Sequence, residues 1–270
     1  MNDFIIREYR AEDVPALSLL WKNTFEDSEA LIADFFRLLP DMGTGLTAVR
    51  DGKVMGAAYV ITGLELIESG KTPVPGGYIY AVAVEEGCRG LGAGSALTRA
   101  AWEEGQRRGA AFVCTLPASG SLYGWYRELL DVEPVLFRST IRAGCAAAEP
   151  VTPVSTEEYG QLREALLRGQ PHLRLSAPAL EFQHRLCEAY GGGFFTVSGG
   201  LCAAYLEGER ALLRELLLPE GKGESAAASV GAAIGAKDFV LYRPVAEGEP
   251  YIAALPGAVP ADCVWNLSFD

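Results

Sequence analysis

The chain has 270 residues, of which 49% are apolar and 21% charged, and its formal net charge at pH 7 is −12. This composition excludes a disordered chain, because nearly half of the residues can be buried in a core. The acidic balance argues against a nucleic-acid partner, since phosphate backbones require a basic surface. It suits a cationic small molecule or peptide, although acidity also serves solubility alone.

At this length the chain is long for one compact domain and sufficient for two. No apolar run approaches the roughly 20 residues that span a bilayer. The opening stretch MNDFIIREYR lacks the pattern of a signal peptide. We therefore expect a cytoplasmic protein with no membrane partner.

The cysteines are scattered and include no C-x-x-C pair, and the chain has only two histidines, His172 and His184. A disulfide framework and a zinc site are both disfavoured by this spacing. We expect reduced cysteines and no bound metal. The six positions are Cys88, Cys114, Cys145, Cys187, Cys202 and Cys263.

The first 143 residues alternate strand and helix patterns in the order β-α-α-β-β-β-α-β-α-β. The hairpin among them turns at Asp51-Gly52. The predicted elements are strand 4–9, helices 11–25 and 28–39, hairpin 45–62, strand 78–84, helix 95–109, strand 111–116, helix 121–129 and strand 135–143. This order predicts an α/β fold with a mixed sheet.

Residues 144–154 are small and proline-containing, without periodicity, which predicts a linker. Beyond it the first half recurs in reduced form. Helical patterns at 156–168 and 178–190 precede a hairpin at 194–208, whose turn we expect at Gly199-Gly200. The triplet Ala57-Ala58-Tyr59 returns as Ala203-Ala204-Tyr205, in each case just after the hairpin turn.

The strand patterns that follow also correspond between the two halves. ALLRELLLP takes the place of YIYAVAV, and DFVLYRP takes the place of AFVCTLP. The interval from Val84 to Phe112 is 28 positions, against 21 from Leu218 to Phe239. The missing seven residues are about the length of a glycine-rich loop. We therefore predict two related units, 1–145 and 153–270, the second lacking that loop.

The glycine-rich loop is EEGCRGLGAGSAL, residues 85–97, between a strand and a helix. It could be a plain turn, a dinucleotide fingerprint or a cradle for another phosphate. The spacing Gly90, Gly92, Gly94 differs from G-x-G-x-x-G, and the loop follows the fourth strand instead of the first. A Walker A loop would need lysine before Ser95, and none is present.

What remains is an R-x-x-G-x-G stretch from Arg89 to Gly94, joining an apolar strand to an apolar helix. Successive glycines let backbone N–H groups turn toward one point. The helix that follows adds its unpaired N–H groups and the positive end of its dipole. Such an arrangement suits a pyrophosphate.

This stretch and the element order over residues 1–143 resemble the GNAT superfamily of acyl-CoA-dependent N-acyltransferases. The resemblance implies a tandem GNAT-like fold, complete in the N-terminal unit and degenerate in the C-terminal one. It also implies acetyl-CoA as co-substrate. The residues it assigns to coenzyme A are Val82, Ala83, Val84, Arg89, Gly90, Leu91, Gly92, Ala93, Gly94 and Ser95.

The resemblance further assigns the oxyanion-stabilising N–H groups to the strand before the loop, at 82–84. A tyrosine on the helix after the fifth strand would give a proton to the departing thiolate. Tyr126 and Tyr123 are the candidates. Trp125-Tyr126 matches the family's aromatic-Tyr pair, so Tyr126 is preferred, whereas positions 130 and 131 are Leu and Asp where Gly-Phe is expected.

A general base is not assigned by the sequence. The candidates by position are Tyr80, Glu85, Glu65 and Glu26. Cys88 adjoins the glycine loop, but no histidine is near it in sequence, which favours a structural cysteine over a nucleophile.

The expected activity is transfer of an acetyl group from acetyl-CoA to a primary amine of a small molecule or peptide, by direct attack in a ternary complex. The alternative is a regulatory module that binds acyl-CoA and transfers nothing. In the second unit Gly221, Lys222 and Gly223 hint at anion binding, but the R-x-x-G-x-G order is missing. That unit could extend the sheet, cover the substrate groove or hold a homodimer together.

Overall fold

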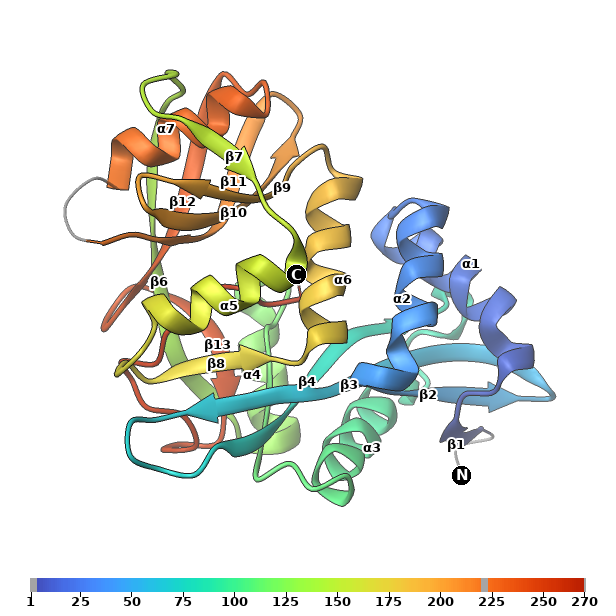
Figure 1. Ribbon diagram of the computed structural model, residues 1–270. Helices are drawn as coiled ribbons and strands as arrows, with labels where there is room; N and C mark the ends of the chain where they lie inside the picture. The colour runs from blue at the N-terminus through green and yellow to red at the C-terminus, as the bar shows by residue number, and fades with distance from the viewer. Residues whose placement is uncertain (1–3, 220–222, 270) are drawn as a thin grey trace.

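The computed structural model describes residues 4–219 and 223–269 and contains one 13-stranded mixed sheet (Figure 1). The first half consists of β1 (Ile5–Glu8), α1 (Val14–Phe25), α2 (Glu29–Met42), β2 (Gly43–Arg50), β3 (Lys53–Ile67), β4 (Val74–Val84), α3 (Ala93–Arg107), β5 (Phe112–Thr115), α4 (Gly120–Leu130) and β6 (Glu133–Gly144). Short 3-10 helices, η1 (Ala11–Asp13) and η2 (Glu86–Cys88), precede α1 and α3. The predicted order of elements in this half is confirmed.

The second half continues the same sheet. It consists of β7 (Val151–Pro153), α5 (Thr156–Leu166), β8 (His172–Leu175), α6 (Ala177–Ala189), β9 (Gly193–Val197), β10 (Gly200–Glu207), β11 (Arg210–Leu217), α7 (Gly223–Ala233), β12 (Asp238–Val245) and β13 (Glu249–Ala254). The predicted linker 144–154 is therefore partly strand, because β7 pairs with β9. Two strands, β8 and β13, have no counterpart in the sequence prediction.

The strands run in the order β1-β2-β3-β4-β5-β13-β6-β12-β11-β10-β9-β7, with β8 paired to β3. Two parallel contacts, β4 with β5 and β11 with β12, occupy matching places in the two halves. The halves also share the hairpin before each parallel pair. The first hairpin turns at Asp51 (φ 51°) and Gly52 (φ 76°), the second at Ser198 (φ 54°) and Gly199 (φ 76°). The second turn is thus one residue earlier than expected.

Each half gives its last strand to the other. β13, from the end of the chain, pairs antiparallel with β5 of the first half, through Ala253↔Thr115 and Ala254↔Cys114. β6, from the first half, pairs antiparallel with β12 from Phe137↔Val245 to Gly144↔Asp238. β6 and β13 also pair with each other, which joins the two halves into one sheet.

Helices cover both faces of the first half of the sheet. α3 packs on β3 and β4 from one side (Figure 1). α1 and α2 cover the other side, and α6 of the second half packs against α2 and β3 there. The amphipathic pattern of α2 explains its position, since Leu31, Phe35 and Leu39 recur at helical spacing and are buried.

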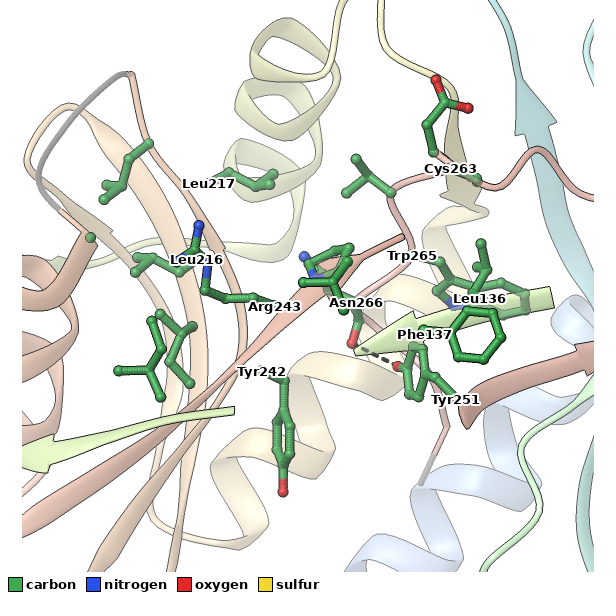
Figure 2. Close-up of a pocket in the computed structure, with 18 of the residues that line it drawn as sticks. Leu136, Phe137, Leu216, Leu217, Tyr242, Arg243, Tyr251, Cys263, Trp265 and Asn266 are labelled. Carbon is green, nitrogen blue, oxygen red and sulfur yellow. Dashed lines mark hydrogen bonds between the residues drawn. The ribbon is translucent and has the colours of Figure 1, made fainter. Parts of the chain in front are cut away.

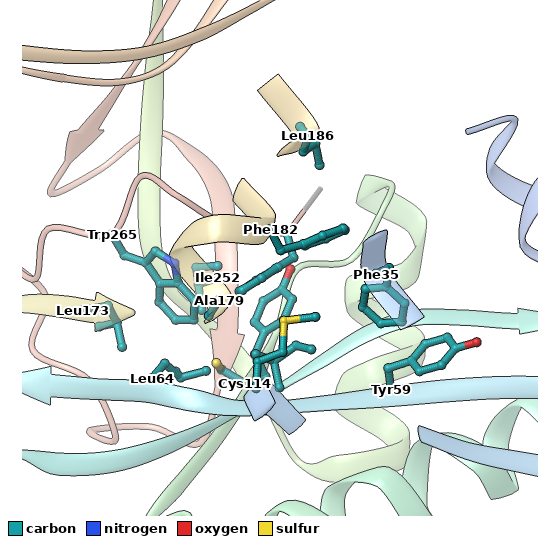
Figure 3. Close-up of a cluster of buried hydrophobic side chains, with 14 of the residues drawn as sticks. Phe35, Tyr59, Leu64, Cys114, Leu173, Ala179, Phe182, Leu186, Ile252 and Trp265 are labelled. Carbon is teal, nitrogen blue, oxygen red and sulfur yellow. The ribbon is translucent and has the colours of Figure 1, made fainter. Parts of the chain in front are cut away.

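The core on this second face draws side chains from both halves (Figure 3). Phe35 of α2 meets Phe182 of α6 with ring centroids 5.2 Å apart. The C-terminal segment adds Trp265 and Phe269, whose rings lie 5.7 and 5.5 Å from that of Tyr78 on β4. The two halves therefore bury a common apolar surface, which stabilises their association.

A buried ion pair connects α5 to β11. The Arg163 guanidinium donates to both carboxylate oxygens of Glu215, at 2.9 and 3.2 Å, and to the carbonyl of Leu173 at 2.9 Å. The Tyr159 hydroxyl donates to Glu215 at 2.8 Å. Both charged side chains are almost inaccessible, at 3% and 0% exposed. Removing one partner would leave the other charge buried without its counter-ion.

We expect Glu215→Leu to lower the free energy of unfolding by about 3–5 kcal/mol, because Arg163 loses its buried counter-ion. Glu209→Ala removes the partner of Lys237 in a pair whose side chains are both 72% exposed, and should cost less than about 1 kcal/mol. Urea denaturation of both variants measures the difference. Equal losses in the two variants would contradict the energetic role given to the buried pair.

Candidate functional site

On one side of β4 the sheet has a gap. The gap begins where β5, the parallel partner of β4, ends. β4 and β5 pair from Gly76↔Phe112 to Ile79↔Thr115. β5 ends at Thr115, whereas β4 continues to Val84. The edge of β4 beyond Ile79 therefore has no strand partner on this side. We call this edge, together with the end of β5, the β4–β5 opening.

The backbone of β4 directs two amide groups into the opening. The N–H of Glu85 donates to the carbonyl of Met55, on the β3 side. N–H groups alternate along an antiparallel strand, so that of Ala83 also points toward β3. Those of Val82 and Val84 point the other way, to the unpaired edge. The predicted segment 82–84 thus provides two donors there.

A β-bulge precedes these donors. Ala81 has a φ of 47°, and the β3–β4 register shifts between Ala57 and Tyr59 at the same place. A bulge adds one residue to a strand and redirects the groups that follow it. Here it sets which amides of β4 face the opening.

The glycine-rich loop forms the end of the opening that leads into α3. After η2, Gly90 (φ 79°) and Gly92 (φ 83°) both adopt left-handed backbone conformations, and Gly92 is the N-cap of α3. The first hydrogen bond of the helix runs from the N–H of Ala96 to the carbonyl of Gly92. The N–H groups of residues 93–95 therefore have no acceptor within the helix. A helix terminus with such N–H groups is suited to an anion.

The side chains of the loop leave this terminus accessible. Arg89 and Leu91 are exposed, and the Arg89 guanidinium donates to the carbonyl of Val84 at 3.3 Å. Ala93 is buried against the sheet. A Cβ on Gly94 would meet only Val84, at 3.6 Å, so the space in front of the helix is open. Ser95, the last cradle residue predicted, is partly buried in the first turn.

Tyr126 lies next to the end of β5. Its side chain is 6% exposed and packs in a small cluster with Val132 and Ala253. Burial raises the pKa of its hydroxyl, and the neighbouring Thr115 hydroxyl acts in the opposite direction. Thr115 in turn donates to the carbonyl of Ile79 at 3.2 Å, where the pairing of β4 and β5 ends. The Tyr126 hydroxyl is thus close to the base of the β4–β5 opening.

Tyr123 is engaged elsewhere. Its hydroxyl donates to the backbone carbonyl of Tyr251 on β13 at 2.9 Å, and burial raises its pKa to about 12. The end of α4 also departs from the expected Gly-Phe. Asp131 takes the left-handed C-cap position, with a φ of 58°, and the next residue, Val132, is buried against Tyr126.

The four candidates for a general base are spread over the first half. Glu65 pairs with Arg174 of β8, toward the far end of β3. Glu26 and Glu85 are exposed at the ends of α1 and β4. Burial strongly raises the pKa of Tyr80, which keeps its hydroxyl neutral. A neutral phenol is a poor base, so this arrangement disfavours Tyr80 for that role.

One acidic residue near the opening is absent from the sequence prediction. Asp27, between α1 and α2, accepts hydrogen bonds from the Trp21 indole at 2.7 Å and from the Tyr190 hydroxyl. Its charge acts on Tyr80, the first residue of β4 beyond the paired segment. The Trp21 ring lies 5.5 Å from that of Tyr80. The loop between two helices carries no periodic signal from which this grouping could be read.

The fold places no histidine beside Cys88, the cysteine considered from the sequence as a nucleophile. Cys88 lies next to Glu85, with its sulfur 3.8 Å from a carboxylate oxygen. His172 contacts Gln170 and Glu164, and His184 contacts Thr156 and stacks on Phe194. Neither histidine activates the thiol. In residues 4–219 and 223–269, no group of three His, Cys, Asp or Glu side chains could hold a metal ion.

The second half has a matching opening with a different lining. β11 and β12 pair from Arg210↔Asp238 to Leu213↔Leu241, and both strands then continue without pairing to each other. Gly223 begins α7 and is exposed, whereas Gly221 and Lys222 lie outside the described residues. A cavity of about 1190 Å³ lies at this opening.

Comparison with protein families gives one match in the first half. Residues 5–126 match the model described as "Acetyltransferase (GNAT) domain". The matched segment includes β4, the glycine-rich loop, α3 and Tyr126. A search of curated proteins finds none that matches the chain.

Solved structures share the fold over nearly the whole chain. A GCN5-related N-acetyltransferase from Kribbella flavida has a TM-score of 0.67 at 16% identity, over 93% of this chain and 71% of that one. One from Anabaena variabilis has 0.66 at 15%, over 93% and 72%. A protein of Pyrococcus horikoshii has 0.64 at 15%, over 97% and 92%. The likeness in fold therefore extends beyond the first half of the chain.

No helix in the described part of the chain combines the length and apolar character that crossing a bilayer requires.

Substitution by alanine should have different effects on stability at two glycines of the loop. Gly92→Ala should cost about 1–2 kcal/mol of stability, because a Cβ is strained at a φ of 83°. Gly94→Ala should be neutral or stabilising by up to about 1 kcal/mol, because the site is helical and its Cβ would have room. Urea denaturation tests the signs; a destabilised Gly94→Ala would contradict the open geometry described.

Proposed function

We propose, from the match of residues 5–126 to the model of the acetyltransferase (GNAT) domain, that the protein transfers an acetyl group from acetyl-CoA to a primary amine of a small molecule or peptide. The amine attacks the thioester directly in a ternary complex, without a covalent enzyme intermediate. The observation that carries the proposal is the conjunction of an unpaired β4 edge with an anion-binding terminus at α3.

In this proposal the loop binds the pyrophosphate of coenzyme A. The N–H groups of residues 93–95 and the positive end of the α3 dipole meet the phosphate charge. Exposed Arg89 adds a guanidinium beside them. The unpaired edge of β4 binds the amides of the pantetheine arm as a neighbouring strand would.

The reaction needs charge stabilisation at the thioester oxygen and a proton for the thiolate. The N–H groups of Val82 and Val84 supply the first, as donors fixed on a strand before the reaction begins. Tyr126 supplies the second. Its raised pKa keeps the hydroxyl protonated at neutral pH, which a proton donor requires.

We assign the acceptor to the face of β4 that carries Tyr80. On that face Tyr80 packs against the buried ring of Trp21, whose indole donates to the half-buried carboxylate of Asp27. Aromatic faces and a carboxylate together favour a cationic amine. The chain's net charge of −12 acts in the same direction.

For the second half we propose a GNAT-like unit that has lost catalysis. The β11–β12 opening repeats the strand geometry of the first, but its sequence lacks R-x-x-G-x-G. The six cysteines, all described, are free thiols, as in a reducing compartment, and we propose a cytoplasmic location.

A second candidate is a module that binds acyl-CoA without transferring the acyl group. The low exposure of Tyr126, at 6%, favours it. Turnover distinguishes the two functions, because a sensor releases no free thiol with any amine.

We expect Gly94→Asp to abolish coenzyme A binding, since a carboxylate would face the pyrophosphate at the α3 terminus. Gly94→Ala, which adds the Cβ alone, is the matched control for folding and space. The measurement is the thermal shift caused by coenzyme A at a concentration about 100-fold above a micromolar Kd. Binding at that concentration stabilises the folded protein by about 2.7 kcal/mol, which raises the Tm of a protein of this size by a few degrees. Wild-type affinity in the aspartate variant would remove the phosphate role from the loop.

Tyr126→Phe should lower turnover roughly 10- to 1000-fold with coenzyme A affinity unchanged. Tyr123→Phe is the control, because its hydroxyl is bonded to the backbone of β13. If Tyr126 donates the proton, activity should persist to above the ordinary tyrosine pKa of about 10, since burial raises its pKa. Loss of turnover in Tyr123→Phe alone would reverse the assignment.

A further inference from the structure

The cavity at the β11–β12 opening is a built space with no role in the proposed reaction. Its volume of about 1190 Å³ exceeds the roughly 300–1,000 Å³ of common ligand sites. Its walls come from both halves, because the exchanged strand β6 forms one side and the segment 261–266 another. Figure 2 shows the labelled side chains around it.

Apolar side chains make most of the wall. Leu216 and Leu217 project from β11, Leu136 and Phe137 from β6, and Trp265 from the C-terminal segment. Such a surface favours apolar ligand groups, because binding removes their apolar surface from water.

The two strands that bound the cavity also offer backbone groups. β11 pairs with β12 only as far as Leu213, so its outer edge over 214–217 has no strand neighbour. An aliphatic chain placed there would bury these N–H and C=O groups without partners, at a cost in free energy. A ligand with amides of its own would bond to them as an added strand.

One cation borders this space, on a side chain that is solvent-exposed. The Arg243 side chain extends from β12 toward the leucines of β11 (Figure 2). Among the described residues, Arg243 has no carboxylate within ion-pair distance. A guanidinium pairs best with a carboxylate or phosphate.

The acidic residues around the cavity limit the choice of anion. Glu149, Glu224 and Asp262 border it, and Glu149 accepts a hydrogen bond from Ser198. Several negative charges on a ligand, as on coenzyme A, would be repelled by these carboxylates. A single carboxylate beside Arg243 is compatible with them.

We propose that this cavity binds a short, extended apolar peptide with a free C-terminal carboxylate. The peptide adds as a strand to the edge of β11, places its apolar side chains against the leucines and pairs its carboxylate with Arg243. This site is separate from the β4–β5 opening and does not depend on the proposed acetyl transfer.

The test is calorimetric titration of the whole protein with the peptide acetyl-Leu-Ala-Leu-Ala, as the free acid and as its C-terminal amide. The acid should bind at least about tenfold more tightly than the amide. Arg243→Gln should weaken binding of the acid at least about tenfold and leave the affinity for the amide unchanged. Arg142→Gln, an exposed arginine of β6 outside the cavity, is the charge-matched control and should change neither.

A second readout locates the peptide. Amide hydrogen exchange across 213–219 should slow when the acid is bound, because the edge of β11 gains a hydrogen-bonded neighbour. Gly94→Asp should leave peptide affinity unchanged, which separates this site from the coenzyme A loop.

Four results would each overturn the proposal. They are no binding of the acid, equal affinity for acid and amide, unchanged affinity in Arg243→Gln, and loss of binding in Gly94→Asp. A fifth is binding of dodecanoate in place of the peptide, which would assign the cavity to an aliphatic acid.

Discussion

The pairing of β6 with β13 is the contact on which the rest of the fold depends. It lies where the halves meet, and through it β5 is bonded to a strand from the second half and β12 to a strand from the first. Neither half has a complete sheet without the other. This exchange brings α6 onto α2 and the C-terminal segment onto β4, so one core serves both halves.

The two openings show how one strand arrangement can present different chemistry. Beyond the last parallel pair, β4 continues with Tyr80 and β11 with Arg214. The first opening ends in a loop whose left-handed glycines expose helix N–H groups. The second lacks that glycine pattern and contains Arg243 instead. The first opening therefore ends in backbone N–H groups, whereas the second combines an unpaired strand edge with a charged side chain.

Local patterns in the sequence predict most of the first half. Helical spacing predicts α2, and paired turn residues predict the hairpin at Asp51-Gly52, because these signals depend on neighbouring residues alone. The glycine-rich loop could be located for the same reason. Its N–H directions could not, since they follow from the register of β4 against β3. The choice between Tyr126 and Tyr123 likewise depends on distant partners, Thr115 and Tyr251.

The sequence does not predict which strands pair when they are far apart in the chain. β13 is a short apolar run between turn residues, and its pattern does not say which strands it joins. β8 and the buried segment around Trp265 were missed for the same reason. Both are placed by contacts with β3 and β4, far away in the chain.

The exchanged strands also bear on how the protein is made. Synthesis runs from the N-terminus, and domains commonly fold as they emerge. Here β5 acquires its outer neighbour only when residues 249–254 have left the ribosome. The outer edge of β5 stays unpaired while the intervening residues are synthesised, and pairing over so long a separation is slow. Premature pairing of that edge with a second chain is therefore the characteristic misfolding hazard of this architecture.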